Sequence, residues 1–320
     1  PRRNALKSAH YDIIGDIHGY ADKLHNLLEK LGYEKTGGVF GHPTRKVIFL
    51  GDFIDRGPQQ KQVLDTAMAM VHNHKALAVM GNHELNALAY HTLDPNTPKD
   101  GPSRHLRWRT KKSTQQHQAF IDAYGTDPKN PELSRVLDFF YSLPLWLELD
   151  GLRIIHACWH AESIEYLASL LNQNHTLSKE LLVAAIPPGS PEHDAIELIL
   201  KGPETRLPDG GRHTDKEGTQ RSHVRLAWWM PPSTPWSAAT RPPNIIAGSH
   251  GDTLVPAEVG LGYSLELPPV LFGHYWFSGQ PSPLAPNVAC LDYSVAKGEK
   301  LCAYRWSGES VLSENNFIYV

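Results

Sequence analysis

Five short apolar runs in this chain each stop at a side chain of the kind that binds metal ions. Four of the runs end in a glycine before the polar residue, and the fifth leads to it directly. The polar residues are Asp16, Asp52, Asn82, His156 and His274. Short apolar runs bounded by turn residues predict buried strands, and a glycine at a strand end permits a sharp turn or the close approach of a ligand. Because open α/β sheets carry their sites at strand ends, we expect these five groups to converge in one crevice.

Convergence of these donors would create a metal site. Carboxylate, amide and imidazole groups together suit hard or borderline divalent ions. Taken singly, an aspartate after a glycine is typical of a turn, and a lone histidine is typical of a satisfied core or surface position. Repetition of the pattern in one chain favours the metal interpretation over a set of unrelated turns.

The first half of the chain alternates between strand and helix patterns. A helix is expected to open at His83 or Glu84, after the third of three strands. The strands are expected near residues 10–15, 46–51 and 76–80, and the helices between them near residues 20–31 and 59–73. This β-α-β-α-β order predicts parallel strands joined by right-handed crossovers, and so an α/β core.

The remainder of the chain is less regular. Residues 92–116 are polar and are expected to form a loop near the mouth of the site, and residues 161–201 are expected to be helical with breaks near Thr176 and Pro187. Further strands are expected near residues 145–149, 152–157, 270–273, 287–292, 300–306 and 310–319. We predict a single domain over residues 1–320, with a helical and proline-rich insertion at about 161–269. A long irregular stretch inside a compact domain is usually functional.

The composition limits which binding partners and which cellular compartment we expect. Charged residues make up 20% of the chain and the formal net charge is −3, which disfavours electrostatic capture of nucleic acid. No stretch approaches the about 20 apolar residues needed to span a bilayer, and the basic N-terminus is not followed by the apolar stretch of a signal peptide. The three cysteines show neither a disulfide framework nor zinc-type spacing. We expect a cytoplasmic protein that binds neither nucleic acid nor membranes, with Cys158 a packed thiol rather than a nucleophile.

The strand ends belong to longer motifs that together resemble the calcineurin-like metallophosphoesterase superfamily. The motifs read Gly15-Asp16-Ile17-His18-Gly19, Gly51-Asp52-Phe53-Ile54-Asp55-Arg56-Gly57, Gly81-Asn82-His83-Glu84, His156 and Gly273-His274. The second and third motifs resemble the phosphoprotein phosphatase branch, of bacterial type. That branch includes serine/threonine protein phosphatases and symmetrical dinucleoside tetraphosphate hydrolases. The resemblance implies a two-sheet β-sandwich flanked by helices around the β-α-β-α-β core.

The resemblance also implies two divalent metal ions. The expected ligands of the first ion are Asp16, His18 and Asp52, and those of the second are Asp52, Asn82, His156 and His274. Two dications and two aspartates leave a surplus charge of +2, which suits a phosphoester. A hydroxide that bridges the ions is the expected nucleophile. Manganese is the favoured metal, and iron and zinc also fit a mixed oxygen and nitrogen donor set.

The remaining motif residues take roles by the same resemblance. His83 is the expected general acid, oriented by Asp55, and Arg56 is expected to hold phosphate oxygens through its planar fork. The expected substrate-binding residues are Arg56, Asn82, Arg225 and Tyr275, with Arg221 as the alternative to Arg225.

The chain departs from the family pattern around the last two ligands. Ala157, Cys158 and Trp159 stand after His156, where the protein phosphatases usually have two glycines. We expect Trp159 to narrow the cleft and His160 to stand near the metals. Tyr275 and Trp276 place aromatic rings near the rim, and the motif at residues 248–252 is expected to lie away from the site.

Three functions are compatible with this sequence. The leading interpretation is a metal-dependent phosphatase that hydrolyses phosphomonoesters of phosphopeptide or phosphoprotein type. The alternative is a symmetrical dinucleoside tetraphosphate hydrolase, which attacks an anhydride. A metal-dependent scaffold that binds phosphorylated partners without turnover is the third, and the presence of His83, Asp55 and Arg56 disfavours it, since a binder needs no acid for a leaving group.

Overall fold

Two β-sheets form the body of the protein. The computed structural model describes residues 10–97, 104–207, 211–214, 220–243, 245 and 251–320. The first sheet has the order β16 (Phe317–Tyr319), β15 (Cys302–Trp306), β1 (His10–Ile14), β4 (Arg45–Phe49) and β5 (Ala76–Ala78). The second has the order β14 (Val288–Cys290), β13 (Val270–Phe272), β7 (Leu152–Ile155) and β6 (Trp146–Leu149). The mixed α/β sandwich expected from the sequence is confirmed.

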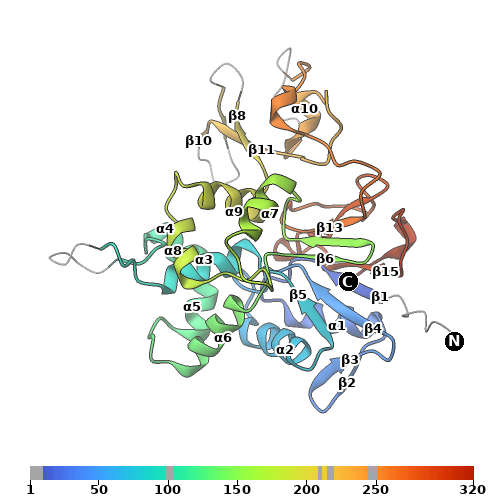
Figure 1. Ribbon diagram of the computed structural model, residues 1–320. Coiled ribbons are helices and arrows are strands. Elements are labelled where there is room, and N and C mark those ends of the chain that lie inside the picture. The colour runs from blue at the N-terminus through green and yellow to red at the C-terminus, as the bar shows by residue number, and fades with distance from the viewer. Residues whose placement is uncertain (1–9, 98–103, 208–210, 215–219, 244, 246–250) are drawn as a thin grey trace.

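The strands β1, β4 and β5 are parallel, as the alternation predicted. Ile14 of β1 is in register with Phe49 of β4, which in turn is in register with Ala78 of β5. The helices α1 (Ala21–Lys30) and α2 (Gln60–His72) connect these strands, and α3 (Asn82–His91) follows β5. Figure 1 shows α1 and α2 beside this sheet. All three strands therefore end at one edge, where the motif residues follow.

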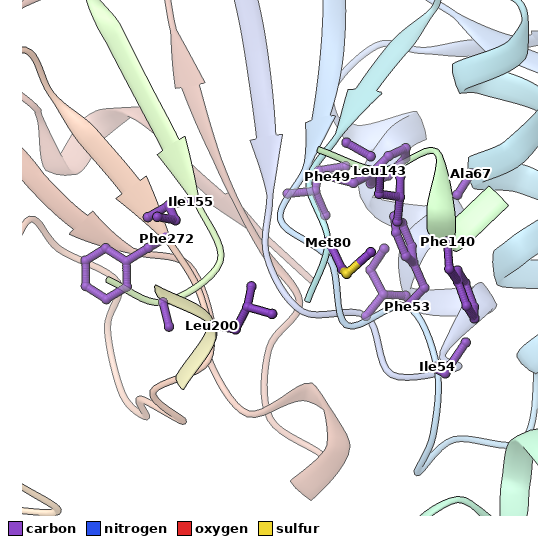
Figure 2. Close-up of a cluster of buried hydrophobic side chains, with 14 of the residues drawn as sticks. Phe49, Phe53, Ile54, Ala67, Met80, Phe140, Leu143, Ile155, Leu200 and Phe272 are labelled. Carbon is purple, nitrogen blue, oxygen red and sulfur yellow. The ribbon is translucent and has the colours of Figure 1, made fainter. Parts of the chain in front are cut away.

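Strand alternation divides the core into two layers. Ile13 belongs to the buried cluster between the sheets, together with Ile48, Ile154 and Leu271, whereas its neighbour Ile14 belongs to the larger outer cluster. The outer cluster includes helix residues that recur at helical spacing, such as Leu24, Leu27 and Leu28 of α1 and Val63 and Leu64 of α2. Figure 2 shows part of it, with Phe49, Phe53 and Met80 near Phe140, and Ile155 and Phe272 near Leu200.

The second sheet brings its own strand ends to the same side of the molecule. β13 is parallel to both β7 and β14, with Leu271 in register with Ile154 and with Ala289. The backbone N–H of Gly273 donates to the carbonyl of His156 at 2.8 Å, so the chain segments after β13 and β7 remain adjacent beyond the strands. This adjacency places His156 and His274 together.

Helices cover the outer faces of the sandwich. The stretch 161–201 is helical with two breaks, as predicted, and 92–116 ends in a short helix that was not expected. That helix begins because the Thr110 hydroxyl accepts a hydrogen bond from the N–H of Ser113. The helices are α4 (Lys111–Gln116), α5 (Gln118–Tyr124), α6 (Pro131–Tyr141), α7 (Ala161–Ala168), α8 (Lys179–Ala185) and α9 (Pro191–Lys201).

The proline-rich stretch 202–269 contains more structure than its composition suggested. It has a three-stranded sheet and a small core of its own that includes Leu207, Val224, Leu226 and Trp236. Its elements are β8 (Glu204–Arg206), β9 (His213–Thr214), β10 (Gln220–Arg221), β11 (His223–Leu226), α10 (Trp236–Ala239), β12 (Thr240–Arg241) and a short 3-10 helix, η3 (Ala257–Val259). The single domain with a helical and proline-rich insertion at about 161–269 stays a prediction.

Two smaller elements also differ from expectation. A hairpin of β2 (Glu34–Thr36) and β3 (Val39–Gly41) precedes β4. The strand expected at 310–319 is confined to β16, because Ser313 caps a 3-10 turn, η5 (Glu314–Asn316), just before it. Another such turn, η4 (Val295–Lys297), follows β14. None of the helices in the described part of the chain has both the length and the apolar character to span a bilayer.

The first glycine of the motif set is required by packing between the sheets. A Cβ atom on Gly15 would lie 2.1 Å from the carbonyl oxygen of Leu291, which is backbone and has no room to move aside. We expect Gly15→Ala to lower the free energy of unfolding by about 1–3 kcal/mol, the usual cost of overpacking. Unfolding in urea measures this loss of free energy. Gly41→Ala is the control, because its nearest neighbour is the flexible Lys75 side chain at 3.5 Å; equal losses in the two variants would refute the packing argument.

Candidate metal centre and active site

The strand ends of both sheets meet at one buried cluster. Asp16 and His18 follow β1, Asp52 follows β4, and Asn82 is the first residue of α3. The second sheet contributes one residue after β7 and one after β13. The six side chains expected to bind metal are all buried, with exposed fractions of 2% for Asp16, His18 and Asp52, 7% for Asn82 and His274, and 0% for His156.

The first half of the cluster centres on the His18 imidazole. Its Nε2 lies 3.9 Å from Oδ2 of Asp16 and 3.7 Å from Oδ2 of Asp52. Its Nδ1 lies 3.0 Å from the carbonyl oxygen of Ile54, which makes Nδ1 the protonated nitrogen and leaves the Nε2 lone pair facing the carboxylates. Nε2 is buried and has no hydrogen-bond partner among the residues described. A buried nitrogen acceptor aimed at two carboxylates is the arrangement that a cation would complete.

The second half of the cluster surrounds His156. Its Nδ1 donates to the carbonyl of Leu50 at 2.7 Å, and its Nε2 lies 3.5 Å from Oδ1 of Asp52 and 3.1 Å from Oδ1 of Asn82. Ligand atoms of Asp52, His156 and His274 all lie within 4.8 Å of one another, and so do those of His18, Asp52 and His83. Asp52 is therefore shared by two groups of candidate ligands.

Backbone geometry explains why glycines precede the ligands. A Cβ on Gly81 would lie 2.2 Å from Oδ1 of Asp52, and one on Gly273 would lie 2.0 Å from Oδ1 of Asp16. Several motif residues also have left-handed backbone, which costs about 1–3 kcal/mol for a non-glycine residue and clusters at functional sites. They are His18 (φ 49°), Asp52 (φ 50°), Asp55 (φ 67°), Arg56 (φ 70°) and His274 (φ 71°).

Two buried carboxylates brace the cluster from behind. The Glu84 carboxylate accepts hydrogen bonds from the backbone N–H groups of Asp52 at 2.8 Å, Phe53 at 2.9 Å and Gly81 at 2.9 Å. Asp292, after β14, accepts from the N–H of Trp276 at 2.7 Å. Glu84 was seen in the sequence only as part of a motif. Asp292 was missed, although it too follows a buried apolar run.

The electrostatics of the cluster call for added positive charge. Burial, together with Asp292 and Asp52, raises the pKa of Asp16 well above its usual range. Burial alone would lower the pKa of His156, but the Asp52 and Asp16 carboxylates raise it to about 10. Burial lowers the pKa of His18 to about 4, so that imidazole is a neutral donor. The carboxylates, the Asn82 amide oxygen and the neutral His18 imidazole fit divalent ions.

His83 connects this cluster to a buried carboxylate. Its Nδ1 lies 2.5 Å from Oδ2 of Asp55, and its Nε2 lies 3.9 Å from Oδ2 of Asp52. Burial alone would lower the pKa of His83, but the carboxylates of Asp52 and Asp55 raise it. The structure thus brings together the pair expected from the motif, with one ring nitrogen on Asp55 and the other directed toward the ligand cluster.

Two arginines and an indole border the cluster. Arg56 is exposed, and its guanidinium carbon lies 5.8 Å from the centre of the Trp276 ring, which is stacked at 5.7 Å on His18. Lys297 Nζ lies 4.2 Å from the centre of the same indole. Arg225 donates from Nη1 to Nε2 of His274 at 2.8 Å, whereas the alternative, Arg221, is an exposed residue of β10.

Other residues that the sequence suggested for the site take part in packing or helix capping. The Tyr275 ring is buried and its hydroxyl donates to the carbonyl of Leu226 at 3.1 Å, so its contact with substrate stays a prediction. Trp276 is the aromatic residue beside the ligands.

His160 caps α7 by accepting from the N–H of Ser163. Trp159 is buried under Arg153. Burial raises the pKa of the Cys158 thiol, which fits a packed thiol. The 248–252 motif lies outside the described residues except for Gly251 and Asp252.

Comparison with known proteins agrees with this geometry. Residues 10–201 match the model of the calcineurin-like phosphoesterase family. The chain belongs to this family. The metallophosphoesterase resemblance drawn from the motifs is thereby confirmed.

Relatives of this phosphoesterase carry a nucleotide-hydrolase name. This chain is 32% identical over 150 residues to bis(5'-nucleosyl)-tetraphosphatase PrpE [asymmetrical] of Geobacillus sp. (strain WCH70). The aligned region covers 46% of this chain and 55% of the relative. This chain is 51% identical over 74 residues to the protein of that name in Anoxybacillus flavithermus, covering 23% and 30%. The matches thus span about a third to half of the relatives' length. These relatives are named asymmetrical, whereas the motifs suggested the symmetrical class.

A solved structure also supports the fold. A cold-active protein tyrosine phosphatase superimposes with a TM-score of 0.50 at 16% identity, covering 94% of this chain and 78% of the other. At this identity the likeness concerns the fold alone.

The bracing role of Glu84 is open to a direct test. Glu84→Gln replaces one acceptor oxygen with an amide that cannot accept from the Asp52 loop. We expect the free energy of unfolding to fall by about 1–3 kcal/mol, the cost of an unsatisfied buried group, and the bound metal per chain to fall in elemental analysis. Glu29→Gln, an exposed position on α1, is the control and should change neither quantity. Full metal content in Glu84→Gln would show that the brace is not needed.

Proposed function

We propose that this phosphoesterase hydrolyses phosphomonoesters of phosphopeptide or phosphoprotein type at a centre of two divalent metal ions. The observation that carries the proposal is the shared Asp52 carboxylate, which lies close to His18 and His83 in one group and to His156 and His274 in the other, while His83 is also bonded to Asp55. A site built only to bind phosphate would have no use for an imidazole backed by a buried carboxylate.

The proposal assigns the ligands as the motifs suggested. Asp16, His18 and Asp52 would hold one ion, and Asp52, Asn82, His156 and His274 the other. Bound ions would neutralise phosphate oxygens and lower the pKa of a water between them. Manganese is our favoured metal, and iron and zinc fit the same donors. The described cysteines are free and buried, which supports a reducing, cytoplasmic setting.

The chain's own residues supply proton transfer and orientation. Asp55 holds Nδ1 of His83, so the Nε2–H of the protonated ring is directed at the cluster and can give its proton to the leaving oxygen. Arg56 is exposed beside Trp276 at the same edge, where its planar fork can bind two phosphate oxygens. We assign Arg225 to a second phosphate contact. Because it now donates to Nε2 of His274, an ion bound at that nitrogen would replace the bond and release the guanidinium toward substrate.

A second candidate function is hydrolysis of dinucleoside tetraphosphates. Two observations favour it: the name of the PrpE relatives, and the position of the Trp276 indole between cationic side chains. Arg56 and Lys297 beside an aromatic ring suit a ligand with several phosphates and a base, since indoles stack on bases and guanidinium groups pair with phosphates.

The general acid has a kinetic signature. We expect His83→Ala to lower kcat by ~10²–10⁴ for substrates with poor leaving groups, the usual contribution of acid catalysis. The loss should shrink for p-nitrophenyl phosphate, whose leaving group needs little protonation. Steady-state kinetics with elemental analysis of each preparation measure both effects. Equal losses on alkyl and aryl phosphates, at unchanged metal content, would reject the acid role.

The two candidate functions differ in their preferred substrate. We expect measurable kcat/KM on phosphoserine, phosphothreonine or phosphotyrosine peptides, assayed beside a dinucleoside tetraphosphate under one set of conditions. If the dinucleoside tetraphosphate exceeds every peptide at least about a hundredfold, a difference of about 2.7 kcal/mol in transition-state binding, the second function replaces the first. No turnover of any of them by the metal-loaded protein would leave only the scaffold hypothesis.

A further inference from the structure

The Asp55 carboxylate holds two imidazoles, only one of which belongs to the expected catalytic pair. Its Oδ2 is bonded to His83, and its Oδ1 lies 2.8 Å from Nδ1 of His117. Asp55 and His117 are each 1% exposed, so water does not compete for either bond. His117 lies 62 positions further along the chain. Nothing in its local sequence marks it.

The ring of His117 is fixed from several sides. His117 lies at the break between α4 and α5, and its backbone N–H donates to the carbonyl of Ser113. Its ring is stacked on Phe120, with centroids 4.7 Å apart and planes at 18°, and contacts the Tyr90 ring at 5.0 Å. Its Nε2 faces Nε2 of His91 at 3.3 Å. Aromatic neighbours on more than one side leave the imidazole little freedom to rotate away from Asp55.

This fixed ring determines how Asp55 can present itself to His83. A carboxylate bonded through one oxygen can rotate about its Cβ–Cγ bond, whereas one bonded through both oxygens to rigid partners cannot. The backbone N–H of Asp55 is also bound, at 2.9 Å, by the buried Gln60 side chain. Burial alone would raise the pKa of Asp55, but the hydrogen bonds from His117 and His83 hold it below its usual range, so the carboxylate is ionised and accepts from both rings.

We propose that His117 is a positioning residue, which holds the Asp55 carboxylate in the orientation that directs His83 at the leaving oxygen. The inference rests on the proposed function, because it assigns His117 a part in the same proton transfer. It also connects the polar segment 92–116 to the proton transfer, since His117 follows this segment directly.

Three substitutions separate the hydrogen bond from the packing. In His117→Asn the amide nitrogen is attached to Cγ, as Nδ1 is in histidine, so the bond to Asp55 can be kept while the ring is lost. His117→Gln places its amide one bond further out, near the position of Nε2. His117→Phe keeps a ring against Phe120 but has no donor.

The readout is the dependence of kcat on the leaving group. With a series of aryl phosphates, we expect His117→Phe and His117→Gln to lower kcat by about 10–100-fold for poor leaving groups, as loss of a residue that orients a functional histidine does. The loss should shrink for good leaving groups, with KM and metal content unchanged. His117→Asn should stay close to wild type. A loss in His117→Phe that is the same for all leaving groups, or none at all, would overturn the proposal, as would His117→Asn behaving like His117→Phe.

A double substitution tests whether His117 acts through His83. In a His83→Ala background, His117→Phe should cause no further loss, because there is no acid left to orient. An additional loss equal to that of the single variant would mean that His117 only supports the fold, and would overturn the proposal.

A measurement without turnover separates this proposal from the proposed function. The proton shared by His83 and Asp55 should give a far-downfield NMR resonance in the wild type, kept in His117→Asn and lost or moved in His117→Phe. This result would uphold the positioning role even if the protein hydrolysed no monoester. An unchanged resonance in His117→Phe would reject the role even if the phosphatase assays succeeded.

Discussion

The Asp52 carboxylate is the group on which the arrangement of the site depends. One of its oxygens faces His18 at 3.7 Å, and the other faces His156 at 3.5 Å. It therefore connects residues that follow β1 of the first sheet with residues that follow β7 of the second. Three features hold it there. Its backbone is left-handed, Glu84 accepts hydrogen bonds from its N–H and from the N–H groups of Phe53 and Gly81, and Gly81 has no Cβ that would clash with it. Because the two sheets are packed through one apolar cluster, the position of this carboxylate is set by the whole sandwich.

The parts of the site that could be predicted from sequence are those with a local pattern. An apolar run, a glycine and a polar residue occupy adjacent positions, so the local sequence identifies Asp16, Asp52 and His274 as candidate ligands. His117 does not, because it reaches Asp55 from a helix break 62 positions away, and only tertiary packing brings the two together. The sequence named both Tyr275 and Trp276 as aromatic residues near the rim. The backbone is left-handed at His274 and at Trp276 (φ 55°), so the side chains do not alternate as in a strand. This backbone places the Trp276 ring beside the ligand His18. The small sheet within 202–269 was missed because proline and glycine punctuate strands too short to show a period.

Each of the two segments least readable from sequence is linked to the site by a described side chain in it or directly after it. Segment 92–116 is followed directly by His117, which is bonded to Asp55. The small sheet of the 202–269 stretch contributes Arg225 from β11, which donates to Glu204 at 2.7 Å and to His274. These two segments are therefore connected to the His83–Asp55 pair and to His274 at separate points. Under the proposed function, changes in these segments would alter phosphate orientation or proton transfer without changing Asp52 itself.

The central claim, that Asp52 lies between two ions, is tested most directly by electron paramagnetic resonance of the protein loaded with manganese. We predict that the wild type binds two Mn(II) ions per chain and gives the spectrum of an exchange-coupled pair, since coupling requires a shared ligand. Asp52→Asn should lose the coupled signal. A single ion per chain, or two ions that give only the signal of isolated Mn(II) in the wild type, would contradict the account.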